Sequence, residues 1–174
     1  KHFISMEGDS LLLIGLFVLC VIFSAYFSAS ESGFARMNKI RMKNRADDGD
    51  KKAKNAMYIS NNHDKALTAI LIGNNIVNVA AASLTTSLAY NFGGSMVAIA
   101  SGIITILILL FGEITPKTMA TIHADKISLF YAPIIDFFMK LMTPVIFIIN
   151  GLSMVVLFIL RVDPNDKNRA MTEN

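Results

Sequence analysis

The 174-residue sequence contains little charge and almost no cysteine. Asp, Glu, Lys and Arg together make up 17% of the residues, whereas soluble domains usually carry about 25%. With 53% hydrophobic residues, the composition excludes an ordinary soluble domain. The single cysteine, Cys20, excludes an internal disulfide. Because Cys20 lies inside an apolar block, we interpret it as a small hydrophobic side chain.

The scarce charges leave long apolar blocks in the chain. Residues 11–35 contain one charged residue, Glu31, and residues 66–92 and 93–112 contain none. About 20 apolar residues are enough for a helix to cross the hydrocarbon core of a bilayer. The sequence therefore predicts an all-α integral membrane protein with three transmembrane helices. The first block is too long for a cleavable signal peptide.

The basic residues are concentrated between the first two blocks. Eight of the sixteen Lys and Arg residues fall within residues 36–54, where three aspartates oppose them. The positive-inside rule places this segment in the cytoplasm and the N-terminus outside. We expect juxtamembrane helices within residues 36–65, because each Lys or Arg near anionic lipid is favourable by roughly 1 kcal/mol; a solvated loop is the alternative. Since the membrane accounts for the basic residues, no nucleic-acid partner is expected.

The remaining segments define the predicted domain organisation. Residues 1–10 are interpreted as an extracytoplasmic leader, residues 11–160 as the transmembrane domain and residues 161–174 as a polar linker toward cytoplasmic domains. An uncharged turn at residues 91–94 is predicted to join the second and third spans. Prolines and charges interrupt the block from 127 to 160, which favours helices at the cytoplasmic interface within residues 120–160. A fourth span remains the alternative, because the last twenty residues of that block are uncharged.

Two sets of uncharged polar residues lie within the first two blocks. Ser24, Ser28 and Ser32 are each four apart, so they share one face of a helix. Close helix packing would explain such small residues equally well. Asn74 and Asn78 are also four apart, with Asn75 beside them. These amides are either hydrogen-bonding groups between helices or oxygen ligands for a cation.

The third block ends in the string Phe111-Gly112-Glu113-Ile114-Thr115-Pro116-Lys117. Pro116 has no N–H and its ring crowds the carbonyl four residues earlier, which belongs to Gly112. We therefore expect a broken helix with a carboxylate, Glu113, beside a freed carbonyl at membrane depth. Irregular backbone at this depth is tolerated mainly where it lines a cavity. A simple ion pair between Glu113 and Lys117 at the interface is the alternative.

Together these groups predict a site for a hard cation. Hydroxyl, amide, carbonyl and carboxylate oxygens from three helices are the ligands that Mg²⁺ prefers. The absence of cysteine and histidine among them argues against zinc or copper. A single carboxylate suits an ion that must bind and then leave.

At these residues the chain resembles the membrane domain of the CorC/CNNM magnesium transporters, also called the DUF21 domain. The resemblance rests on residues 27–33 (FSASESG), 73–78 (GNNIVN) and 111–117 (FGEITPK). It implies a homodimer in the cell membrane, with three membrane helices and cytoplasmic juxtamembrane helices in each subunit, and Mg²⁺ export driven by Na⁺ entry. It also implies an ion site made of Ser24, Ser28, Asn74, the Gly112 carbonyl and Glu113, with Ser32, Asn75 and Asn78 as neighbours. The ATP-binding CBS pair of that family is not in this sequence, so ATP binding is not expected on this chain.

Three other functions use parts of the same pattern. A passive Mg²⁺ channel would need the same ligands without coupling. A Mg²⁺-sensing membrane regulator would bind the ion without transporting it. An intramembrane enzyme would need acid–base residues such as His63 with Asp64, or His123 with Asp125, but helix capping and surface charge explain these pairs better.

Overall fold

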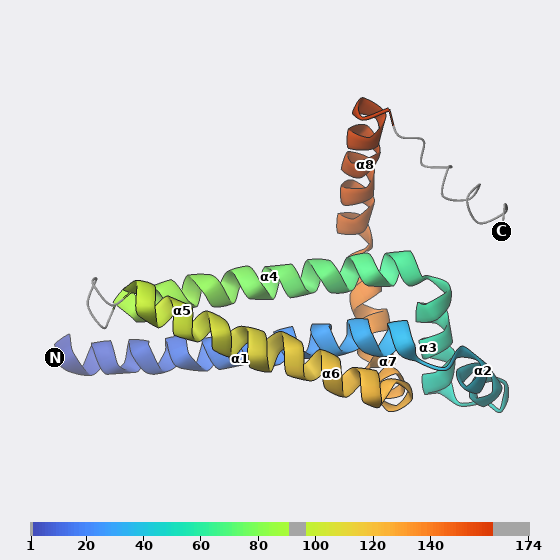
Figure 1. Ribbon diagram of the computed structural model, residues 1–174, viewed down its shortest axis with the longest axis horizontal. Coiled ribbons are helices and arrows are strands. Elements are labelled where there is room, and N and C mark those ends of the chain that lie inside the picture. The colour runs from blue at the N-terminus through green and yellow to red at the C-terminus, as the bar shows by residue number, and fades with distance from the viewer. Residues whose placement is uncertain (1, 91–96, 162–174) are drawn as a thin grey trace.

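The computed structural model describes residues 2–90 and 97–161, and within these ranges every regular element is a helix (Figure 1). Three long helical stretches have the length and apolar composition of membrane spans, at Ser10–Arg36, His63–Tyr90 and Val97–Ile122. The predicted all-α class with three membrane helices is therefore confirmed. The predicted turn at residues 91–94 and the linker beyond Arg161 lie outside the described residues.

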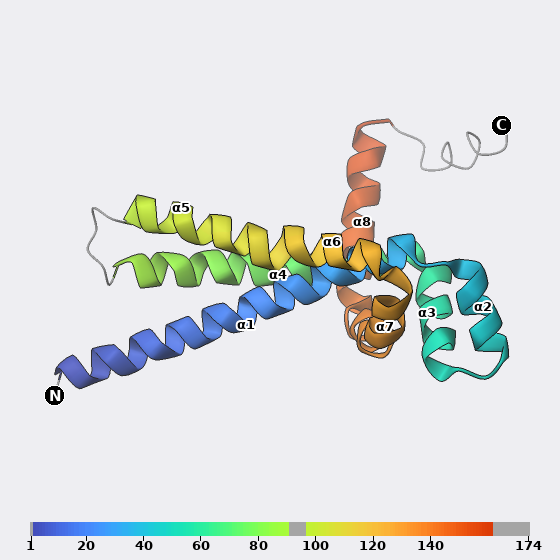
Figure 2. The same ribbon diagram turned by 60° about the horizontal axis from the view of Figure 1, so that its bottom comes forward.

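The three spans run alongside one another (Figures 1 and 2). They are formed by α1 (His2–Arg36), by α4 (His63–Tyr90), and by α5 (Val97–Ile108), the π-helical segment η2 (Leu109–Ile114) and α6 (Thr115–Ile122) in succession. The N-terminus lies at the same end of the molecule as the end of α4 and the start of α5. The basic segment lies at the opposite end.

Two short helices make up that basic segment, α2 (Lys39–Asp47) and α3 (Lys51–Asn61), as predicted. The Asn38 side chain caps α2 by accepting a hydrogen bond from the Arg41 N–H. Asp50 caps α3 by accepting from the N–H groups of Lys52 and Ala53, and a hydrogen bond from Arg45 lowers the pKa of the Asp50 carboxyl. Such caps satisfy N–H groups that a helix start leaves unpaired.

The last two helices, α7 (Ala124–Leu141) and α8 (Thr143–Ile159), are bent by 63° at Met142. In both views they run across the three spans rather than alongside them, which is the direction that an interfacial segment takes (Figures 1 and 2). By length and composition the bent pair could still form a fourth span.

The core lies where α7 crosses α1 and α4. Buried side chains from α1, α3, α4 and α7 meet there. The ring of Phe27 lies 5.1 Å from that of Phe138, and the Tyr26 and Tyr131 rings are 4.3 Å apart. The Tyr26 hydroxyl also donates to the Tyr131 carbonyl at 3.3 Å. These contacts hold α7 against α1.

Candidate ion-binding site

The Ser24 hydroxyl is the point at which the three spans meet through polar atoms. Ser24 is 1% exposed, and its Oγ lies 3.3 Å from Asn74 Oδ1. The same Oγ lies 3.0 Å from Asn78 Oδ1 and 3.3 Å from the Gly112 carbonyl oxygen. We call these four residues the Ser24 cluster. It contains one residue from α1, two from α4 and one from η2.

Three acceptor oxygens surround a single hydroxyl proton at Ser24. A serine hydroxyl has a single proton to donate, so it can satisfy only one of these oxygens at a time. The two asparagine amides also carry N–H donors, but their oxygens face the hydroxyl in this structure, so several lone pairs lie close together in a mostly buried place. Such a place is electrically suited to a cation with hard-oxygen preferences.

Close approach of η2 to α1 depends on the glycine at position 112. A Cβ added to Gly112 would lie 3.1 Å from Ser24 Oγ and 3.3 Å from Ser24 Cβ. Both contacts are tight, so a larger residue would push the two helices apart or displace the hydroxyl. The glycine therefore allows the backbone carbonyl to act as a member of the cluster.

The backbone around Gly112 forms a π-helical turn rather than the predicted break. The Thr115 N–H donates to the carbonyl of Leu110, five residues earlier. Pro116, the next residue, has no N–H with which to complete an ordinary α-helical bond to Gly112. The wider turn takes up the irregularity while the chain stays helical from Val97 to Ile122. Such π-turns occur often at functional sites.

Ser28 is placed one turn along α1 from the cluster. It is fully buried, and its Oγ has no hydrogen-bond partner among the described residues. An unpaired buried hydroxyl costs free energy, so an ion would supply the missing partner. Ser32, one turn further, is half-buried.

Asn75 and Asn78, both predicted as neighbours of the ion site, differ in their placement on α4. Asn75 is exposed on α4 and takes no part in the cluster. Asn78, which the family pattern offers only as a neighbour, makes the shortest contact with Ser24. The four-residue spacing from Asn74 is the sequence signal that indicates this role, because it places both amides on one helix face.

The Glu113 carboxylate forms an ion pair with Lys117 instead of contacting Ser24. Lys117 Nζ lies 3.4 Å from Glu113 Oε1 and 3.1 Å from Glu31 Oε2. The predicted alternative, an ion pair between Glu113 and Lys117, is therefore present in this structure. Sequence reasoning did not include Glu31 in this arrangement, although Glu31 is the only charged residue in its apolar block.

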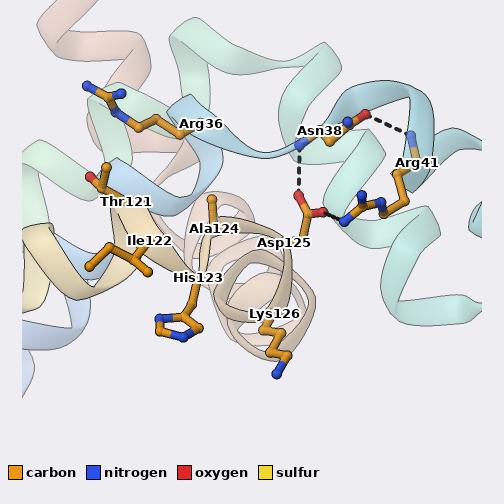
Figure 3. A pocket seen from close by; sticks show the side chains of 9 residues that line it. All are labelled: Arg36, Asn38, Arg41, Thr121, Ile122, His123, Ala124, Asp125 and Lys126. Atoms are coloured by element: carbon orange, nitrogen blue, oxygen red, sulfur yellow. Dashed lines mark hydrogen bonds and ion pairs between the residues drawn. The ribbon is translucent and has the colours of Figure 1, made fainter.

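A hollow of about 370 Å³ lies where α1, α2, α6 and α7 meet, and its lining includes His123 and Asp125 (Figure 3). Asp125 accepts from the backbone N–H of Asn38 at 2.8 Å and pairs with Arg41 at 2.8 Å. His123 points away from Asp125, so the two do not form an acid–base pair. The contacts of Asp125 agree with the explanation by helix capping and surface charge. Throughout the described ranges, no three His, Cys, Asp or Glu side chains gather into a site of the kind that holds zinc or copper.

Comparison with known proteins identifies the family to which the chain belongs. A family model described as the cyclin M transmembrane N-terminal domain matches residues 15–174. The chain belongs to the cyclin M transmembrane domain family. The predicted CorC/CNNM resemblance is confirmed.

Curated relatives extend well beyond the matched region. The chain is 39% identical over 146 residues to a UPF0053 protein of Haemophilus influenzae, covering 82% of this chain and 35% of that protein. It is 33% identical to the UPF0053 inner membrane protein YfjD of Escherichia coli, covering 77% and 32% respectively. It is 26% identical to the polyamine export protein of Escherichia coli, covering 84% and 36%. The chain thus spans about a third of the length of these relatives.

Proposed function

We propose that this chain is the membrane core of a secondary-active transporter that exports Mg²⁺ and is driven by Na⁺ entry. It acts as a homodimer in the cell (inner or plasma) membrane, with the N-terminus outside and the C-terminus in the cytoplasm. The observation that carries the proposal is the Ser24 cluster, in which oxygens from three spans surround one buried hydroxyl. The name of the inner membrane relative YfjD agrees with this location.

In the proposed site, Mg²⁺ binds the oxygens of Ser24, Ser28, Asn74 and Gly112, with Glu113 as the charged ligand. Asn78 joins them, since its amide oxygen already lies 3.0 Å from Ser24 Oγ. Mg²⁺ requires about six oxygens in octahedral geometry, and this set supplies that number without a second carboxylate. To reach the ion, Glu113 has to turn away from Lys117, which retains its ion pair with Glu31.

The π-helical segment is the element best placed to alternate between two states. It carries both Gly112 and Glu113, so a change in its winding would alter two ligands at once. Irregular helices at the binding site are common in secondary transporters. Na⁺ entering from the outside would compete for the same oxygens and displace Mg²⁺.

A second candidate cargo is an organic polyamine. A relative of 26% identity is a polyamine export protein. In addition, the primary ammonium of Lys117 lies between the carboxylates of Glu31 and Glu113. A polyamine ammonium could take that position if Lys117 moved aside. The Ser24 cluster favours Mg²⁺, because hydroxyl, amide and carbonyl oxygens gathered from three spans are ligands for a hard cation.

The decisive experiment is Mg²⁺ flux into and out of liposomes that contain the purified chain, with and without an opposing Na⁺ gradient. We expect Asn74→Ala and Glu113→Gln to lower Na⁺-driven Mg²⁺ flux at least tenfold. Asn75→Ala is the matched control, because Asn75 follows Asn74 on the same helix but is exposed. Its flux should stay within twofold of the unmodified chain.

Four results would contradict parts of the proposal. Equal flux from the Asn74 and Asn75 variants would exclude the Ser24 cluster as the site. Mg²⁺ flux that ignores the Na⁺ gradient would indicate a passive channel. Mg²⁺ binding without flux would indicate a sensor. Transport of putrescine in place of Mg²⁺ would identify the polyamine as the cargo.

A further inference from the structure

A groove with a mixed polar and apolar lining lies between α4 and the stretch formed by α5 and η2. Its volume is about 320 Å³. We call it the α4–α5 groove. Its lining is formed by Asn78, Ala82, Thr85, Thr86, Ser101, Thr105, Ile108, Leu109 and Glu113.

The lining residues follow one continuous face of each helix. On α4 they begin at Asn78 and recur four, seven and eight residues later; on the opposite side they begin at Ser101 and recur at the same intervals before Glu113. Residues at these intervals share one face of a helix. The groove is therefore formed by two facing helix surfaces, over about two turns of α4 and about three turns of the α5–η2 stretch.

The inner end of the groove coincides with the candidate ion site. Asn78 is a member of the Ser24 cluster, and Glu113 follows Gly112 directly. The outer end is marked by Thr86 and Ser101. At 1.5 Å per residue, Thr86 lies about 12 Å further along α4 than Asn78, and only four residues before the end of α4 at Tyr90. The groove thus covers most of the distance from the site to the end of the bundle that carries the N-terminus (Figures 1 and 2).

The groove is lined by hydroxyls whose protons are already used. The hydroxyls of Thr85, Thr86 and Thr105 each donate to a backbone carbonyl one turn earlier, at 2.8, 3.1 and 2.7 Å. Their remaining lone pairs can accept hydrogen bonds from water around a cation. The groove contains one charged residue, Glu113 at its inner end, so a cation would be attracted inward without being held along the way.

A second cavity of the same volume differs from the α4–α5 groove in the chemical nature of its lining. That cavity, about 320 Å³ between α1, α4 and α7, is lined almost entirely by apolar atoms of residues such as Phe23, Phe138 and Met142. Neither Ser24 nor Asn78 lines it. Of these two cavities, only the α4–α5 groove combines hydroxyl groups along its mixed lining with a residue of the Ser24 cluster.

We propose that the α4–α5 groove is the water-filled path through which the ion leaves the site toward the outside. The inference rests on the proposed function for its cargo and on the positive-inside rule for its direction. The ion leaves Asn78 and Glu113, keeps its water shell against the hydroxyls of the groove and emerges beside the ends of α4 and α5. Thr85 and Thr105 then line the path without being ligands.

Cysteine accessibility tests this path directly, because the chain has a single cysteine. In a Cys20→Ala background, Thr85→Cys and Thr105→Cys would be treated with a charged, membrane-impermeant methanethiosulfonate from the outside of sealed vesicles. Only the thiolate reacts, so reaction requires contact with water. Ser83→Cys is the matched control, since Ser83 is exposed on the same helix but does not line the groove. We expect both groove cysteines to react at least tenfold faster than the control, and their modification to block Mg²⁺ flux.

The labelling and flux results separate the path from the proposed function. Reaction of both groove cysteines no faster than Ser83→Cys, or only from the cytoplasmic side, would overturn the path. Thr85 is buried, so its replacement can disturb folding. If the Thr85→Cys variant does not fold, the Thr105→Cys variant tests the path by itself, because Thr105 is exposed. Rapid labelling in a chain that moves no Mg²⁺ would support the aqueous groove and overturn the transport proposal. Mg²⁺ flux without labelling would support the transport proposal and overturn the path.

Discussion

Single glycines decide how closely the spans approach one another. A Cβ added to Gly73 would lie 2.5 Å from Phe27 Cζ and 2.7 Å from Cε1. Phe27 cannot move aside easily, because its ring is buried and packs against Phe138. Gly102, in contrast, has no atom within 4 Å of such a Cβ. The first glycine is required by packing, while the second is not.

Gly73→Ala is therefore expected to destabilise the chain, and Gly102→Ala is not. Overpacking a well-filled core usually costs about 1–3 kcal/mol, whereas alanine in an open helical position favours the helix by up to about 1 kcal/mol. Thermal unfolding in detergent, followed by circular dichroism, would measure both. Equal melting temperatures for the two variants would mean that Phe27 and α4 adjust more freely than their packing implies.

At the scale of helices, η2 combines a structural irregularity with the carbonyl that we propose as an ion ligand. Pro116 leaves the Gly112 carbonyl without its usual partner, and the π-turn brings that carbonyl within 3.3 Å of Ser24 Oγ. Helical stability and ion binding therefore make opposite demands on this segment. A regular α-helix would be more stable but would use the Gly112 carbonyl in its own backbone.

Pro116→Ala should separate these two demands. The alanine supplies an N–H for the Gly112 carbonyl, so we expect an unchanged or higher melting temperature together with roughly tenfold weaker Mg²⁺ binding. A tenfold loss corresponds to about 1.4 kcal/mol. Pro133→Ala is the control, because Pro133 also lies inside a helix, α7, away from the Ser24 cluster. Isothermal titration with Mg²⁺ would detect the difference, and unchanged binding in Pro116→Ala would show that the π-turn is irrelevant to the site.

For the molecule as a whole, the main question is the membrane topology. The basic helices α2 and α3 lie at one end of the three spans, and the N-terminus lies at the other (Figure 1). The bent pair of α7 and α8 runs across them, beginning near the same end as α2 and α3. If this pair lies at the interface, the chain crosses the membrane three times and Arg161 remains on the cytoplasmic side.

Labelling of single cysteines would test this topology in the Cys20→Ala background. Asp48→Cys and Arg161→Cys should react with an impermeant maleimide only after the membrane is opened. An N-terminal epitope should be accessible to antibody in intact cells. Reaction of Arg161→Cys from the outside, with Asp48→Cys still protected, would establish α7 and α8 as a fourth span.

Much of the fold was predictable because membrane spans depend on composition. The three apolar blocks correspond to the three long helices, and the concentration of basic residues corresponds to α2 and α3. The site was less predictable. The spacing of Asn74 and Asn78 indicates a shared face, but not that Asn78 would be nearer to Ser24 than Asn74. The proline predicted an irregularity at Gly112, but not whether the helix would break or widen.

The sequence by itself determined that this is a cyclin M membrane domain with three apolar helices, because backbone groups in lipid must be satisfied within a helix and hydrophobic length can be counted along the chain. Only the tertiary structure decided which polar groups meet. Ser24 contacts residues 50, 54 and 88 positions away, and these contacts depend on how the helices are rotated and packed. It also decided between the two roles that the sequence left open for Glu113, which pairs with Lys117, and it brought Glu31 from another helix to the same ammonium. The reason is that a half-buried charge pairs with whichever opposite charge the packing of the helices brings near.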